Sequence, residues 1–280
     1  MNSKKLWVGV ALSAFLLTAC VKQTPGQIAY PDDVKRPKLS QYELNVISEK
    51  IYQNETSGNP KHLMFWSTNE SFASLGIGHF IWYPKGEPKR FDETFPAMID
   101  YYVANKVEIP QWLHHARKNG APWKDRATFE RARNDKEFQQ LKMLLMNTKA
   151  LQTQFFFDRL HASIPEITKH VAPQYRDHIV NNYNALVSTT GGLYPLIDYI
   201  NFKGKGIKAT ERYNNQGWGL LQVLKNMKPV KTGPLALIEF SRSAREVLER
   251  RVRNSPPENN EQRWMEGWTK RTNGYATSIL

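Results

Sequence analysis

The sequence predicts a mostly helical α+β protein with one small β-hairpin. Two observations carry this prediction. Apolar residues recur at helical spacing through most of the chain after residue 40. Only the stretch between residues 62 and 83 combines aromatic and β-branched residues with turn chemistry, which is typical of strands. One small hairpin beside many helices fits an α+β architecture.

The chain opens with what we interpret as an export signal. Lys4 and Lys5 precede an apolar run at residues 6–17, which is too short to span a bilayer and has the length of a signal-peptide core. The run ends in residues 17–20 (LTAC), which resemble the lipobox of bacterial lipoproteins, where the cysteine is lipidated. The alternative is a buried hydrophobic helix that contains a cysteine. We expect removal of residues 1–19 and a lipid on Cys20.

The predicted export signal affects which binding partners the composition and charge of the chain suggest. Cys20 is the only cysteine, so a disulfide framework and a thiolate metal site are excluded. Without residues 1–19 the chain has 37 basic and 26 acidic residues, a net charge of +11. A basic surface attracts polyanions, and in an exported protein an anionic envelope polymer is a better partner than nucleic acid. The alternative is an ordinary solvated surface, since no block of five basic residues occurs.

A tether is predicted behind the lipid anchor. Residues 20–39 contain three prolines, one glycine and little periodicity, and fully extended they reach at most about 65 Å. Residues 40–280 are predicted to form the folded domain. We expect the protein to lie in the bacterial cell envelope, anchored to the outer membrane and facing the periplasm. Further helices are predicted at residues 91–105, 136–160, 174–189, 217–227, 234–251 and 261–270.

The first predicted helix of the domain ends in a carboxylate. A capping box at residues 40–43 (SQYE) starts this helix, and the turn residues 56–60 (TSGNP) end it. Glu55 lies in line with the apolar stripe of the helix, where desolvation favours the protonated acid. A protonated carboxyl group can donate to a glycosidic oxygen. The alternative is a helix-terminal Glu paired with a surface lysine.

A glycine-rich strand is predicted some twenty residues later, at Phe72–Trp82. With period two, one of its faces is mostly apolar. The other face places Ser74, Gly76 and Gly78 between aromatic residues that include Trp82. Glycines inside a strand mark close backbone approach, so a sugar ring could lie on this face. The alternative is a glycine-rich bend without a ligand.

Residues 74–79 (SLGIGH) resemble the hydroxyl-x-Gly-Ile-Gly-His strand of phage-type lysozymes. The resemblance covers roughly residues 47–80. It implies a lysozyme-like fold and cleavage of the β-1,4 bond in peptidoglycan glycan strands, without a cofactor. It also implies that Glu55 is the general acid, that Ser74 lines the cleft and that His79 supports the hairpin.

One departure from the family leaves the mechanism open. No Asp lies between Glu55 and Ser74, where the family has its second carboxylate, and Glu70 is the only acidic residue there. Hydrolysis with inversion needs a second carboxylate to activate water. Lytic transglycosylases, which are related in fold, use a single Glu and close an anhydro ring. The chain is therefore a muramidase, a lytic transglycosylase or, alternatively, a non-catalytic wall-binding or scaffold lipoprotein.

Two weaker patterns lie elsewhere. Residues 213–222 (YNNQGWGLLQ) loosely resemble the Gly-Leu-Met-Gln box of lytic transglycosylases, although they come late in the chain. Tyr213, Trp218 and Gln222 are candidate sugar contacts, because rings stack on sugars and amides bind hydroxyls. The alternative is ordinary loop and core aromatics. The adjacent His114 and His115 lack further ligands, so no metal site is predicted.

Overall fold

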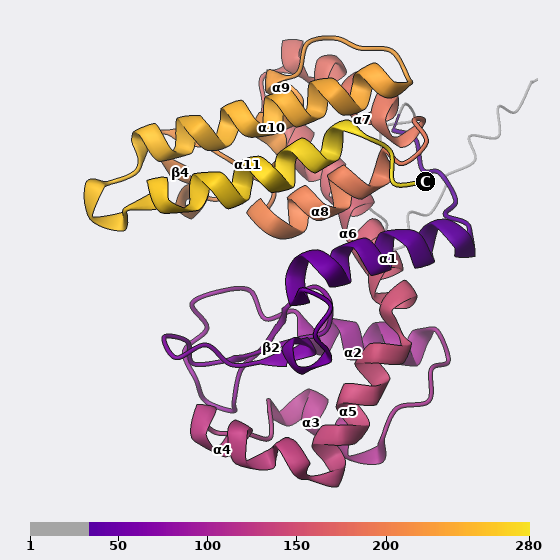
Figure 1. The fold of residues 1–280 in the computed structure, drawn as a ribbon, viewed down its shortest axis with the longest axis vertical. Helices are drawn as coiled ribbons and strands as arrows, with labels where there is room; N and C mark the ends of the chain where they lie inside the picture. Colours follow the sequence, from indigo (N-terminus) through magenta and orange to yellow (C-terminus); the bar gives the residue numbers. More distant parts are fainter. Residues whose placement is uncertain (1–33) are drawn as a thin grey trace, which may run out of the picture.

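Two packed helices, α1 (Gln41–Thr56) and α6 (Lys149–Lys169), connect two lobes in the computed structural model (Figure 1). The structure describes residues 34–280, so the predicted signal peptide, Cys20 and most of the predicted tether lie outside the described residues. Residues 57–148 build the N-terminal lobe, and the chain after α6 builds the C-terminal lobe. The chain is mostly helical with a small antiparallel sheet, as predicted.

Helix α1 begins and ends where the sequence predicts. The Ser40 side chain caps its N-terminus, and Glu43 completes the capping box. Ser57 ends the helix in the left-handed conformation, with φ of 53°. Ile47 and Ile51 are buried against the core. Helix α1 therefore sets the residues just before position 56 at the junction of the two lobes.

The sheet of the N-terminal lobe has three short antiparallel strands in the order β1 (Met64–Phe65), β2 (Ala73–Leu75) and β3 (Phe80–Trp82). The single continuous strand predicted here is wrong, because a tight turn separates β2 from β3. Gly76, with φ of 71°, and His79, with φ of 46°, adopt left-handed conformations that reverse the chain. The predicted hairpin is present: Ser74 and Leu75 belong to β2, and residues 76–79 form the turn.

Helices account for most of the remaining chain. The N-terminal lobe adds α2 (Phe95–Ala104), α3 (Gln111–Asn119), α4 (Arg126–Arg131) and α5 (Lys136–Asn147). The C-terminal lobe contains α7 (Arg176–Val187), α8 (Leu193–Lys203), β4 (Arg212–Tyr213), β5 (Gln216–Gly217), α9 (Leu220–Asn226), α10 (Pro234–Asn254) and α11 (Met265–Asn273).

The differences from prediction are local. The predicted helix at residues 136–160 is two helices, because the chain breaks at Thr148 between α5 and α6. Helices α3, α4 and α8 and the β4–β5 hairpin were not predicted. That hairpin turns at Asn214 and Asn215, both with positive φ, which asparagine tolerates better than most residues.

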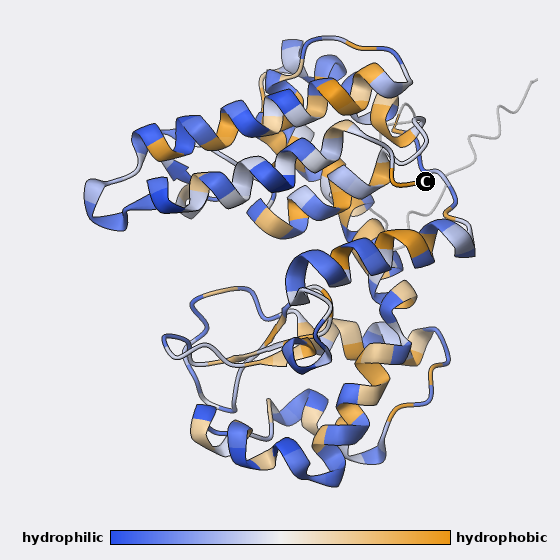
Figure 2. Cartoon of the chain, in the orientation of Figure 1, coloured by the Kyte–Doolittle hydropathy of each residue, from blue (hydrophilic) through white to orange (hydrophobic). Residues whose placement is uncertain are grey.

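The core of each lobe is rich in aromatic side chains. In the N-terminal lobe, Trp82 packs against Phe95 and Trp123, with ring centroids 4.9 and 6.1 Å away. Helix α10 alternates hydrophilic and hydrophobic residues along its length (Figure 2) and buries the hydrophobic ones, including Leu237 and Phe240. Within residues 34–280, no helix combines the length and apolar character that crossing a membrane requires.

Candidate active site

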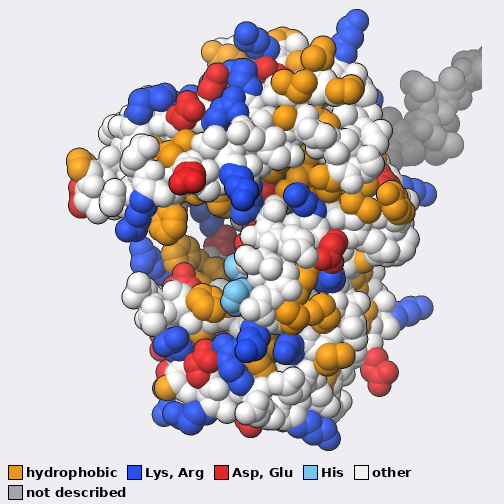
Figure 3. All heavy atoms as spheres, in the orientation of Figure 1, with side chains coloured by type: hydrophobic (Ala, Val, Ile, Leu, Met, Phe, Trp, Pro, Cys, Tyr) orange, Lys and Arg blue, Asp and Glu red, His pale blue; other side chains and the backbone are white. Residues whose placement is uncertain are grey.

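A cleft of about 500 Å³ lies between the two lobes. The β2–β3 turn and β3 line it from the N-terminal lobe, α6 lines its back, and the loop after α8 lines it from the C-terminal lobe. Figure 3 shows this hollow between the lobes, with histidine side chains at its edge. The cleft is open enough for a chain-like ligand and has both apolar and charged walls.

Glu55 lies at this junction, next to the wall of the cleft. It is the last residue but one of α1, and its side chain is 15% exposed. Its Oε2 lies 3.6 Å from Nδ1 of His79, and His79 lines the cleft. Its Oε1 accepts a hydrogen bond of 2.6 Å from Nη2 of Arg271 in α11. The predicted position of Glu55 at the helix end is confirmed, but its surroundings are ionic rather than apolar.

Arg271 is held mainly by a second carboxylate. Its Nε and Nη2 donate to the two oxygens of Asp198, at 2.7 and 2.8 Å. Asp198 is 1% exposed and also accepts a hydrogen bond of 2.5 Å from the Tyr275 hydroxyl. Burial alone would lower the pKa of Arg271, but Asp198 and Glu55 together raise it above its ordinary value. The guanidinium therefore stays charged and forms a fixed ion pair with Asp198.

The charge of this cluster is unbalanced. The guanidinium of Arg271 donates three hydrogen bonds to two carboxyl groups, and Asp198 accepts two of the three. Burial lowers the pKa of His79, although the charge of Glu55 opposes this effect, so the imidazole is neutral at neutral pH. With both acids ionised, the cluster of Glu55, Asp198, Arg271 and His79 carries one excess negative charge.

Glu70 has a different environment. It is exposed in the turn between β1 and β2. Partial desolvation raises its pKa, and the positive charge of Arg90 opposes the rise. Among the described residues, no side chain donates a hydrogen bond to its carboxylate. Nothing there fixes Glu70 in a position to assist Glu55.

The small residues of the SLGIGH turn pack against α6 more than they face the cleft. A Cβ on Gly76 would lie 2.4 Å from Oε1 of Gln152, which accepts a hydrogen bond from the backbone of Ile77. A Cβ on Gly78 would lie 1.9 Å from Cζ of Phe156. Gly78 lines the cleft, whereas Gly76 and the buried Ser74 lie outside its lining. Of the three small residues predicted to face a sugar, only Gly78 therefore lines the cleft.

The remaining predicted sugar contacts lie outside the cleft. Trp82 is fully buried in the N-terminal lobe, so the prediction that it contacts substrate is wrong. Tyr213 and Trp218 pack on each other in the C-terminal lobe, with ring centroids 4.6 Å apart. Gln222 donates to the carbonyl of Gly206 and holds the loop after α8. These three side chains are not part of the cleft wall, because they stabilise the loop and helix ends behind it.

Sequence reasoning missed Asp198 and Arg271. The apolar run at residues 193–202 contains Asp198 as its only acidic residue, and a lone acid in such a helix signals a buried carboxylate that needs a partner. No local sequence signal identifies Arg271 as that partner, because the two residues are 73 positions apart. Within residues 34–280, no group of three or more His, Cys, Asp or Glu side chains could hold a metal ion.

Comparisons of this chain with protein-family models, with curated proteins and with solved structures found no match. The function is therefore argued from the geometry of the cleft and of the charged cluster beside it.

Proposed function

We propose that this protein is a lysozyme-like glycosidase that cleaves the β-1,4 glycan bond of peptidoglycan. The observation that carries the proposal is the position of Glu55 at the end of α1, beside an open cleft and inside a cluster with one excess negative charge. Glu55 is the proposed proton donor, because its carboxyl group lies beside His79, which lines the cleft. Gly78 and His79, which end the stretch 74–79 that resembles phage-type lysozymes, line this cleft.

In the proposed first step, Glu55 donates its proton to the glycosidic oxygen as the bond to the sugar breaks. The carboxylate that forms is stabilised by Arg271, whose hydrogen bond to Glu55 becomes an ion pair. Asp198 keeps the guanidinium in place throughout, because it accepts from both Nε and Nη2. The neutral His79, 3.6 Å from Glu55, can support the return of a proton to this carboxylate.

The second step follows from the absence of a fixed partner for Glu55. Inverting hydrolysis needs a second carboxylate held across the scissile bond, and Glu70 is exposed without a hydrogen-bond donor on its carboxylate among the described residues. We therefore favour attack by a hydroxyl of the same sugar, with Glu55 as the base that accepts its proton. The product is an anhydro sugar, which is the outcome of a lytic transglycosylase.

The test is digestion of purified peptidoglycan, with mass spectrometry of the soluble products. Glu55→Gln should lower the rate by at least about 10²-fold, because Gln cannot donate the proton. Glu49→Gln is the matched control, since Glu49 lies on the same helix but is exposed and paired with Lys149. Products lighter by one water would indicate the transglycosylase. Reducing ends together with an inactive Glu70→Gln would instead assign hydrolysis.

A second candidate function is non-catalytic binding of the cell wall. The Glu55–Arg271 contact favours it, because a carboxyl group held by a buried guanidinium can serve to join the two lobes rather than to react. No release of fragments by the wild-type protein, with binding to peptidoglycan retained, would support this alternative. Under either function we propose that lipidated Cys20 anchors the protein in the bacterial envelope and that peptidoglycan glycan strands are its partner.

A further inference from the structure

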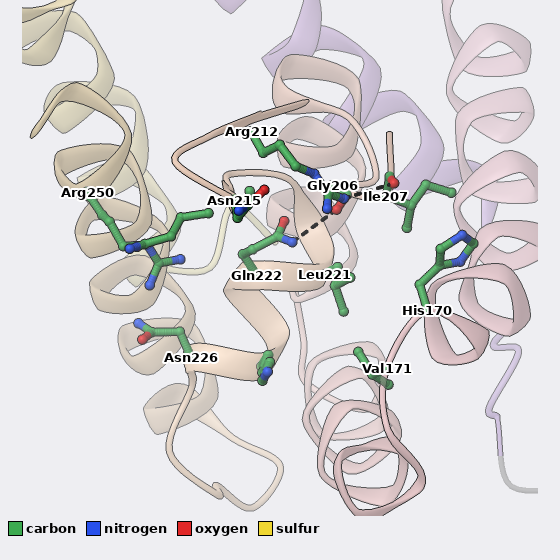
Figure 4. Close-up of a pocket in the computed structure, with 13 residues that line it drawn as sticks. His170, Val171, Gly206, Ile207, Arg212, Asn215, Leu221, Gln222, Asn226 and Arg250 are labelled. Atoms are coloured by element: carbon green, nitrogen blue, oxygen red, sulfur yellow. Dashed lines mark hydrogen bonds between the residues drawn. The ribbon is translucent and has the colours of Figure 1, made fainter. Parts of the chain in front are cut away.

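A second cavity, of about 560 Å³, lies in the C-terminal lobe. Arg250 comes from α10, Gln222 and Asn226 come from α9, and His170 lies on the opposite side at the end of α6 (Figure 4). The β4–β5 turn contributes Asn215. Apolar side chains and amide side chains alternate around the cavity, so its wall is neither purely hydrophobic nor purely charged.

The charged side chains of this cavity are all basic. Arg212, Lys225 and Arg250 line it together with His170, and no Asp or Glu belongs to the lining. None of the three cations forms an ion pair with a described residue. Two acids bond residues of the lining: Glu246 accepts from Asn226 and pairs with Arg242, and Glu211 accepts from the backbone of Gly206.

The hydrogen-bonding capacity of these cations is only partly used. Arg212 donates to the backbone carbonyls of Ile207 and Lys208, and Lys225 lies 4.2 Å from the centre of the Tyr175 ring. Nε of Arg250 is buried without a hydrogen-bond partner. A buried guanidinium donor without a partner is costly, and an anionic ligand is the simplest group to satisfy it.

The cavity and the inter-lobe cleft share one loop. The chain after α8 lines the cleft through Lys205 and Lys208, and it lines the cavity through Gly206 and Arg212. Ile207 belongs to both walls. A ligand in the cleft and a ligand in the cavity would therefore contact the same loop.

We propose that this cavity binds an acidic peptide, namely the carboxylate-bearing peptide stem that branches from the peptidoglycan glycan. The proposal rests on the proposed function, because the cleft would hold the glycan from which the peptide branches. Three unpaired cations match carboxylates, and the side chains of Asn215 and Gln216 match the donors and acceptors of peptide bonds. A bare phosphate would leave these amides and the apolar wall without a partner.

Calorimetric titration of the purified protein with the free tetrapeptide stem of peptidoglycan tests this proposal. Arg250→Gln should weaken binding of the peptide at least about tenfold, the value of one charge-assisted hydrogen bond. Arg253→Gln is the matched control, because Arg253 lies on the same helix but is exposed and outside the cavity lining. The peptide with its carboxylates amidated should bind weakly to wild type and to both variants.

Two outcomes would overturn the proposal. One is equal affinity for the free peptide in wild type and Arg250→Gln, and the other is tighter binding of inorganic phosphate or anionic lipid vesicles than of the peptide. The free peptide contains no glycosidic bond, so its binding does not depend on cleavage. Binding by a protein that cleaves no glycan would refute the proposed activity alone, and cleavage without peptide binding would refute the cavity assignment alone.

Discussion

The charged residues at the lobe interface and those in the C-terminal cavity are arranged in opposite ways. At the interface, Arg271 is shared by Asp198 and Glu55, so all three of these charged side chains have a partner. In the cavity, Arg212 and Arg250 have no carboxylate partner among the described residues. Paired buried charges hold a structure in one geometry, whereas unpaired charges lower its stability and leave binding energy for a ligand. Paired residues such as Arg271 and Asp198 hold a site in position, whereas unpaired residues such as Arg250 can bind an anion.

The largest effect is expected from breaking the interface cluster. Asp198→Asn replaces an acceptor of three short hydrogen bonds by an amide whose NH₂ group faces other donors. Since Asp198 is 1% exposed, we expect the free energy of unfolding to fall by about 3 kcal/mol, measured by urea denaturation. Asp92→Asn is the control, because its pair with Lys208 is exposed and is expected to contribute at most about 1 kcal/mol. Equal losses in the two variants would contradict the comparison.

A smaller effect concerns the pH dependence of the same cluster. The pKa of His79 is lowered by burial in the folded protein, so the unfolded chain binds more protons as the pH falls below 6.5. The stability that His79 contributes is therefore present above pH 6.5 and is lost as the pH falls through the folded pKa.

The free energy of unfolding of the His79→Asn variant should fall less than that of wild type between pH 7 and pH 5. Asparagine keeps the left-handed backbone of the turn but does not titrate. Urea denaturation at several pH values measures this difference. Parallel pH profiles for the variant and wild type would show that His79 is not buried in its neutral form.

The smallest effect is expected in the cavity. Arg250→Gln removes one of several neighbouring cations and a buried Nε without a partner. We expect the free energy of unfolding to stay within about 0.5 kcal/mol of wild type or to rise, in contrast to Asp198→Asn. Thermal denaturation at low and high salt checks this, since salt screens repulsion between cations and should help wild type more than the variant. A loss of several kcal/mol would show that Arg250 has a structural partner.

The parts of the fold that depend on local sequence could be predicted. The capping box at residues 40–43 and the turn at residues 56–60 set the ends of α1, and so the position of Glu55. The glycines of the SLGIGH stretch predicted close backbone approach, but periodicity could not tell a strand from a turn, and the reversal at His79 was missed. The glycine at position 78 implied that another group packs closely against the backbone there. The sequence could not show that this group is Phe156.

The candidate site was predictable only in part, because its other residues are distant in sequence. Trp82 was expected at a binding surface, since aromatic residues serve both sugar sites and cores, and only tertiary packing decides between them. Arg271 was not identified as a site residue, since a basic helix end looks the same in sequence whether or not a buried carboxylate faces it. No local pattern relates Arg271 to a residue 216 positions earlier.

That separation of 216 residues also sets the order in which the site is built during synthesis. The ribosome makes Glu55 and the turn of the β2–β3 hairpin early, and it makes α11 near the end of the chain. Until α11 docks, Glu55 lacks Arg271, and Asp198 lacks the cation that matches it. A chain without a docked α11 therefore has one wall of the cleft but an incomplete charged cluster. The charged cluster can form only when the C-terminal lobe is complete.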